Sequence, residues 1–276
     1  MNSPLLPETL VNSITVGNQS NPKVATLLDG SYVIVWESAG QDGSGSSVVA
    51  QRFTAAGERI GNEFLVNSNQ TGDQRDVSVT GTDDGGFVIV WEGVNQDDPG
   101  SFDTGIFGQR YDASGLPAGE EFQVNAVNTS STQFEPEVAS IPGGGFAVTY
   151  QDDLGDGSSD GIRVRFYDAG GVPTGPDVQV NTEVSGNQYD PGIGTIQASA
   201  DPNGLTNGGV VVVWTSPTSG TAGDGGSDGV FAQIYDNTGA AVGTEFLVNT
   251  QTTGSQRDAS VTGLAGGRFV VVWEDT

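Results

Sequence analysis

An internal repeat, running through nearly the whole chain, is the feature that most constrains its fold. Five Val-Asn pairs mark the copies, and a Gln follows each pair seven or eight residues later. An apolar run ending in an aromatic residue comes next, 17 residues after the Gln in four copies and 26 residues after it in one. The aromatic residues are Trp36, Trp91, Tyr150, Trp214 and Trp273. Self-similarity at such a period is typical of architectures built from repeated structural units.

Each copy has room for four short strands separated by turns, as the second copy illustrates. Its residues 76–80, 87–92, 105–111 and 121–125 are strand-like runs, and Gly and Asp between them favour turns. No apolar period of 3.6 residues is long enough for a helix. Four antiparallel strands per copy predict a blade of an all-β propeller, because a lone four-stranded sheet needs neighbours to cover its faces. Tandem β-sandwiches and an open β-solenoid are the alternatives.

Counting strands predicts five blades, the last of them incomplete. The segment 5–12 matches the fourth strand of a copy, which brings the expected total to 19 strands. The copies cover residues 5–65, 66–123, 124–179, 180–247 and 248–276, and we expect them to form one repeat domain over residues 1–276. The last copy stops where the others enter an acidic loop, so we expect a fragment of a longer protein. An incomplete last blade has an unpaired strand edge, which predicts self-assembly.

Charge and residue chemistry exclude several classes of function. The net charge is −26, with Lys23 as the single lysine, and such a polyanion repels nucleic acid and anionic membranes. The absence of Cys and His excludes disulfides and any Ser–His or Cys–His catalytic unit, and removes the usual ligands of zinc. No apolar run is long enough for membrane insertion, and residues 1–17 lack a typical secretory signal. A site that binds a hard cation through oxygen ligands is not excluded.

Acidic loops between the second and third strands differ from copy to copy, which makes them candidates for function. Copies three and four share Asp-Gly-x-Ser-Asp-Gly, whose two carboxylates can curl around one hard cation with backbone carbonyls as further ligands. Calcium tolerates such irregular cages better than magnesium does. The predicted calcium ligands are Asp156, Asp160, Asp224, Asp228, Asp98 and Asp103. A solvated hairpin loop, in which Asp and Gly only make turns, is the alternative.

A second motif, Gln-x-acid, precedes the first strand of four copies. Its acids are Asp76, Glu135, Asp190 and Asp258, and the first copy has Asn21 at that place. A ring of these residues can line the mouth of a channel. Alternatively, each motif ties the crossover between blades to its neighbour by hydrogen bonds. Because every copy has some form of the motif, we expect the structural role, and we expect the aromatic residues of the repeat in the core.

Three stretches, residues 63–67, 71–76 and 86–92, resemble a repeat of very large bacterial surface and secreted proteins. These proteins are grouped with RTX-like calcium-binding adhesins. The resemblance implies export to the cell surface or the extracellular space, and calcium as a ligand. The Gly-Gly-x-Gly-x-Asp nonapeptides that define true RTX blocks are absent. There is a looser likeness to sialidase-type and integrin-type propeller blades, although the arginines are too scattered to form the sialidase cluster.

We therefore expect a non-enzymatic, calcium-stabilised extracellular propeller for adhesion or surface assembly. Acidic residues are so frequent that no catalytic pair stands out. A glycan-binding, lectin-like propeller is the first alternative, with glycans or other surface proteins as partners. A polysaccharide-active hydrolase or lyase is the second, because paired carboxylates can perform acid–base chemistry.

Overall fold

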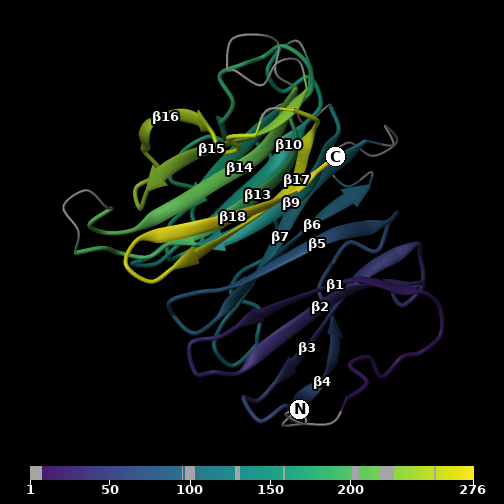
Figure 1. Cartoon of the computed structure of the whole chain (residues 1–276). Helices are drawn as coiled ribbons and strands as arrows, with labels where there is room; N and C mark the ends of the chain where they lie inside the picture. Colours follow the sequence, from purple (N-terminus) through teal and green to yellow (C-terminus); the bar gives the residue numbers. More distant parts are fainter. Residues whose placement is uncertain are drawn as a thin grey trace.

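The computed structural model describes residues 8–94, 96, 103–127, 131–157, 159–200, 205–217, 227–251 and 253–276. Within these ranges every regular element is a β-strand, and no helix suited to crossing a bilayer occurs. The strands form four antiparallel sheets of four strands and one sheet of two strands (Figure 1). The predicted all-β propeller of four-stranded antiparallel blades is therefore confirmed.

Each sheet, or blade, lies within one copy of the repeat. Blade 1 contains β1 (Gln19–Thr26), β2 (Tyr32–Ala39), β3 (Ser46–Phe53) and β4 (Arg59–Leu65). Blade 2 contains β5 (Gln74–Gly81), β6 (Phe87–Val94), β7 (Thr104–Tyr111) and β8 (Phe122–Gln123). Blade 3 contains β9 (Gln133–Ser140), β10 (Phe146–Asp152), β11 (Gly161–Tyr167) and β12 (Val178–Gln179). Blade 4 contains β13 (Tyr189–Ile196), β14 (Gly209–Pro217), β15 (Asp228–Asp236) and β16 (Ala241–Leu247). Blade 5 contains β17 (Gln256–Leu264) and β18 (Arg268–Asp275).

The strands of a blade follow one another in space as they do in sequence, so the first strand of each blade is an edge strand. These first strands are β1, β5, β9, β13 and β17, and consecutive ones pack against each other from β1 to β17. Their residues line one central cavity. The repeat therefore brings five equivalent strands, one per copy, to the centre of the molecule.

The hydrophobic core lies between adjacent blades. Along β6, Val88 and Val90 pack toward blade 3, whereas Ile89 and Trp91 pack toward blade 1. Because both faces of the strand are covered, the run is apolar without alternation. This two-sided burial explains the β-branched run that each copy carries.

The aromatic residue that ends each run is a core residue, as predicted, in the four complete blades. Trp36, Trp91, Tyr150 and Trp214 are at most 4% exposed. Trp273 is 37% exposed. In blade 4 the third strand supplies Phe231, which stacks on Trp214, and the two-stranded blade 5 has no such strand.

The expected strand at residues 5–12 is not formed in its described part, residues 8–12. This segment runs along blade 1 and is held by side chains. The guanidinium of Arg59 donates to the carbonyl of Leu10 at 2.8 Å, and the N–H of Ser13 donates to Glu63 at 2.5 Å. The described residues therefore form 18 strands and not the expected 19.

Candidate functional site

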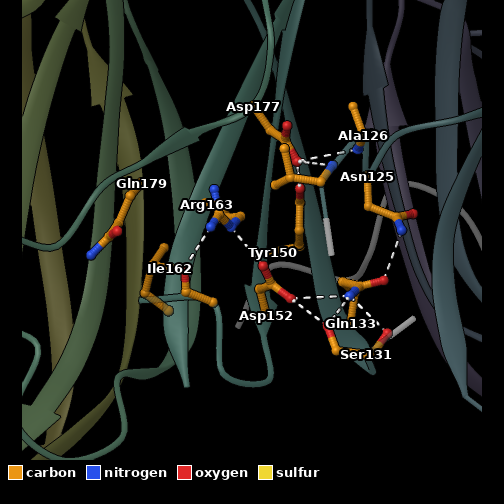
Figure 2. A network of polar contacts seen from close by, with 12 residues as sticks. Asn125, Ala126, Ser131, Gln133, Tyr150, Asp152, Ile162, Arg163, Asp177 and Gln179 are labelled. Atoms are coloured by element: carbon orange, nitrogen blue, oxygen red, sulfur yellow. Dashed lines mark hydrogen bonds and ion pairs between the residues drawn. The ribbon is translucent and has the colours of Figure 1, made fainter. Parts of the chain in front are cut away.

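The Gln of the Gln-x-acid motif is part of the scaffold, as the sequence predicted. In blade 3, Asn125 of the Val-Asn pair donates to the Gln133 side chain at 2.8 Å and accepts from the N–H of Ile106 at 2.9 Å (Figure 2). The same Asn–Gln bond joins Asn12 to Gln19, Asn67 to Gln74, Asn181 to Gln188 and Asn249 to Gln256. Each bond ties the crossover into a blade to the start of its first strand, which satisfies buried amide groups.

Blade 3 adds a buried ion pair to this network. Asp152 is 0% exposed, accepts from Gln133 at 3.0 Å and lies 2.6 Å from the guanidinium of Arg163 (Figure 2). Asp152 is the last residue of β10, directly before the acidic loop of this copy. A carboxylate held in this way belongs to the scaffold and is not available to a ligand.

The acid of the Gln-x-acid motif has a different position. In every first strand the pairing register shifts at this residue, which marks a β-bulge. The residue adopts a positive φ in all five copies: Asn21 (49°), Asp76 (47°), Glu135 (54°), Asp190 (52°) and Asp258 (52°). Positive φ is uncommon for residues other than Gly, and bulges re-aim side chains near functional sites. The repeat thus preserves a strained backbone at five equivalent points.

A cavity of about 430 Å³ lies where these bulges meet. Residues from all five first strands line it, among them Asn21, Lys23, Asp76, Glu135, Glu137 and Asp190. Lys23 is the one cation in this lining, and its ammonium lies 2.8 Å from a carboxylate oxygen of Glu137. The cavity is therefore a strongly acidic centre within the described part of the chain.

Crowded carboxylates perturb proton binding at this centre. Burial, together with the negative charges of Glu135 and Asp258, raises the pKa of Asp190 from 3.8 to about 7. Burial and neighbouring acids, among them Asp190's partner Asp258, also raise the pKa of Glu135. Ionising Asp190 beside the like charges of Glu135 and Asp258 is unfavourable, which keeps its proton bound to a higher pH. A carboxyl that keeps its proton near neutral pH can act as an acid.

A second pair of acids lies beside the first. Glu92 follows Trp91 on β6 and is 2% exposed. Burial raises the pKa of Glu92 to about 7, against the opposing effect of Arg75, whose guanidinium lies 2.9 Å away. Burial and the charge of Glu37 likewise raise the pKa of Asp76. The acidic centre thus contains several groups that titrate above their usual range.

The structure describes four of the six predicted calcium ligands. Asp98 and Asp224 lie outside the described residues, and Asp103 is partly buried just before β7. Asp156 accepts from the N–H of Ser159 at 2.9 Å, a bond within its own loop. The list is completed by Asp160 and Asp228, which have side-chain partners of their own.

Asp160 accepts from the side chain of Gln151 at 2.9 Å, and burial followed by nearby like charges raises its pKa. Asp228 forms an ion pair with Arg257 of the next blade, at 2.5 Å. Among the described residues no three Asp, Glu, His or Cys side chains converge as a metal site. The expected classification as a calcium-binding protein is therefore wrong for the described residues. Calcium as a ligand stays a prediction.

Two of the acidic segments nevertheless contact residues of the Gln-x-acid motif that follows them. The carbonyl of Asp160 accepts from the N–H of Gln188, at the start of the first strand of blade 4, at 3.0 Å. Asp228 reaches Arg257, the residue before Asp258. The sequence placed function in the loops and the motif acids in the scaffold. In the sequence, the motif acids could have been identified as functional because this position varies between Asn, Asp and Glu while the Gln two residues earlier is invariant.

Comparison with known proteins relates this architecture to carbohydrate-active propellers. The α-L-arabinanase of Penicillium chrysogenum, solved with arabinobiose, superposes with a TM-score of 0.57 at 15% identity, over 96% of this chain and 80% of that chain. The α-L-arabinofuranosidase of Fusarium graminearum, also solved with arabinobiose, gives 0.55 at 13% identity, over 90% and 73%. No protein-family model and no curated protein sequence matches the chain. At these identities the likeness establishes the fold.

These findings correct three expectations from the sequence. The solved structures that share the architecture are an arabinanase and an arabinofuranosidase, so the resemblance to RTX-like adhesin repeats is wrong. The expected non-enzymatic adhesion module and its classification as no enzyme are overturned by the same comparison. The physical reason for the error is that most residues that carried the resemblance, such as Val66, Asn67, Gln74 and Trp91, are buried and build the blade, so they report the repeat and not its chemistry.

Proposed function

We propose that the chain is a glycoside hydrolase that acts on a polysaccharide through the acidic central cavity. The observation that carries the proposal is Asp190: it lines the cavity beside Asp258, with a pKa of about 7. Glycoside hydrolysis needs one protonated and one ionised carboxyl on either side of the scissile bond. The likeness to propellers solved with arabinobiose supports a glycan as the ligand.

Asp190 is the proposed proton donor. Near neutral pH it retains a proton that it can pass to the glycosidic oxygen as the bond to the sugar carbon breaks. The negative charges of Glu135 and Asp258 help to keep this proton on Asp190 until the transfer. The cavity, at about 430 Å³, accommodates one or two sugar units in contact with this group.

Glu137 is the proposed ionised partner. Its two carboxylate oxygens are held separately, one 2.8 Å from the ammonium of Lys23 and the other 2.6 Å from the hydroxyl of Ser78. The ammonium compensates its negative charge within an otherwise acidic lining. A fixed, charge-compensated carboxylate is suited to take a proton from water or to stabilise the positive charge that develops on the sugar ring.

Turnover of arabinan, arabino-oligosaccharides and a panel of neutral polysaccharides, measured as released reducing ends, tests the proposal. We expect Asp190→Asn and Glu137→Gln each to lower kcat/KM by about 100-fold or more, because each removes one half of the acid–base pair. Glu120→Gln is the matched control, since Glu120 is exposed and remote from the cavity.

Two outcomes would overturn the hydrolase proposal. Turnover that survives both substitutions would place the chemistry elsewhere. Saturable glycan binding in calorimetry without any turnover would indicate the lectin-like reading, with glycans as partners of the same cavity. Other surface proteins as partners, self-assembly and an extracellular location stay predictions beside it, and sedimentation and secretion assays check them.

A further inference from the structure

Buried glutamates from one blade hold the strained bulges of the next. The N–H of Asp76, in blade 2, donates to Glu37 of blade 1 at 2.7 Å. The N–H of Glu135, in blade 3, donates to Glu92 of blade 2 at 2.9 Å. Glu37 and Glu92 occupy the same place in the repeat, directly after the aromatic residue, and are 8% and 2% exposed. We call this contact the glutamate clamp.

The clamp is absent from the next two copies. Gln151 stands at that place in blade 3 and donates to Asp160, while Thr215 stands there in blade 4 with a buried hydroxyl that has no partner. The bulge at Asp190 has no such clamp among the described residues; instead Asp190 lines the central cavity together with Glu135 of the adjacent strand β9. Glu135 therefore receives the last clamp and lies in the same cavity as the proposed proton donor.

We infer that Glu92 is a positioning residue: by fixing the bulge of Glu135 it keeps the Glu135 carboxylate beside Asp190 in the central cavity. The inference deepens the proposed function, because it explains how the proposed acid is placed. Arg75 supports Glu92 from the same blade through a 2.9 Å bond to its second oxygen. With both oxygens engaged, Glu92 has one orientation, which a side chain with a single partner would lack.

The Glu135 carboxylate connects Glu92 to the pKa of Asp190. Its negative charge is the largest contribution, after burial, to the raised pKa of Asp190. The charged groups that act on these two residues from the packed strands are Asp76, Glu137, Asp258 and Arg257. None of them lies on β6, so displacing Glu135 through Glu92 changes the Asp190 environment without removing a direct neighbour of Asp190.

Carboxyl titration by NMR of protein labelled with ¹³C at Asp and Glu tests the inference without a substrate. In Glu92→Gln, which is isosteric, we expect the Asp190 midpoint to fall from near 7 by about half a unit or more, as Glu135 moves away. Glu92→Asp keeps the charge but is one methylene shorter, so it loses the contact to Glu135 and should give the same shift. Glu37→Gln is the matched control, because its clamp holds Asp76, and the Asp190 midpoint should not move.

Unchanged Asp190 titration in both Glu92 variants would overturn the inference, as would a shift in Glu92→Gln that Glu92→Asp does not reproduce. If one of the two variants does not fold, the other still decides, since both predict the same shift. Where the enzyme turns over, we expect Glu92→Gln to lower kcat about tenfold with KM within about twofold. The NMR titration does not depend on turnover, so it tests this inference even if the protein shows no hydrolase activity. Failure of the proposed function and failure of this inference are therefore distinguishable.

Discussion

Two residues of one motif, two positions apart in sequence, belong to different regions of the molecule. Gln74 is 0% exposed and bonded to Asn67, and Gln133, Gln188 and Gln256 repeat that arrangement. The acid two residues later has a left-handed backbone in each of these copies and differs from copy to copy, and Asp76, Glu135 and Asp190 line the central cavity. The first region is the amide scaffold, made of the Asn–Gln pairs, and the second is the acid ring, made of the five bulge residues.

The difference shows what each region requires. A buried amide must find donors and acceptors wherever it occurs, so the scaffold is constant in all five copies. The acid ring needs only a residue that tolerates positive φ, so its chemistry is free to vary, and like charges accumulate there at a cost in stability. Strain and charge repulsion concentrated at one centre, with the scaffold compensating, are typical of functional sites.

Removing a scaffold amide should have the largest effect. Asn67 is 4% exposed and accepts from the N–H of Val48 at 2.9 Å while donating to Gln74. Asn67→Ala leaves buried groups on both sides without partners, so we expect a loss of about 2–4 kcal/mol in the free energy of unfolding. Urea denaturation followed by tryptophan fluorescence measures it.

Asn207→Ala is the control for this substitution, because Asn207 is exposed in a turn. Its unfolding free energy should stay within about 0.5 kcal/mol of the parent protein. Equal losses at the two positions would show that the amide scaffold has no special role.

Removing a carboxyl from the acid ring should have the opposite sign and depend on pH. The folded-state pKa of Asp190 is raised from 3.8 to about 7, so the folded chain binds this proton more tightly than the unfolded chain. Its contribution to stability is fully present below about pH 4 and is lost as pH rises to about 7. Because the group is only half-buried and screened, we expect a loss of about 1–2 kcal/mol across that window.

Asp190→Asn isolates this contribution. The variant and the parent protein should unfold at similar urea concentrations near pH 4, and the variant should be the more stable by about 1–2 kcal/mol at pH 8. Parallel stability curves for the two proteins from pH 4 to pH 8 would contradict the raised pKa.

The fold was predictable because it follows from requirements that every copy shares. The apolar run at 87–92 needs cover on both faces, and the turns are determined by local Gly and Asp residues. The first strand of each copy could be assigned on the same grounds. The described part of segment 5–12 is the exception: it matches a strand in sequence, but its partners are Arg59 and Glu63 side chains and no strand.

The site was less predictable because long-range placement decides it. Nothing local distinguishes Asp152, which is buried against Arg163, from Asp160 at the other end of the same acidic segment. The motif acids were recognised, but a channel and a structural tie were both compatible with their spacing. In the structure both roles occur within one motif: Gln133 forms the structural hydrogen bond to Asn125, and Glu135 lines the central cavity.

The smallest effect should come from completing the acid ring at its one uncharged position. Asn21 donates to Glu37 at 2.8 Å from a backbone that Asp also tolerates. Asn21→Asp replaces this bond by the contact of two carboxylates, so we expect a loss of about 0.5–1 kcal/mol at pH 8 that shrinks toward pH 4 as the pair takes up a proton. Asn18→Asp, on the exposed segment before β1, is the matched control for added charge and should change stability less. A pH-independent effect at position 21 would mean that lost hydrogen bonding, and not repulsion within the acid ring, causes it.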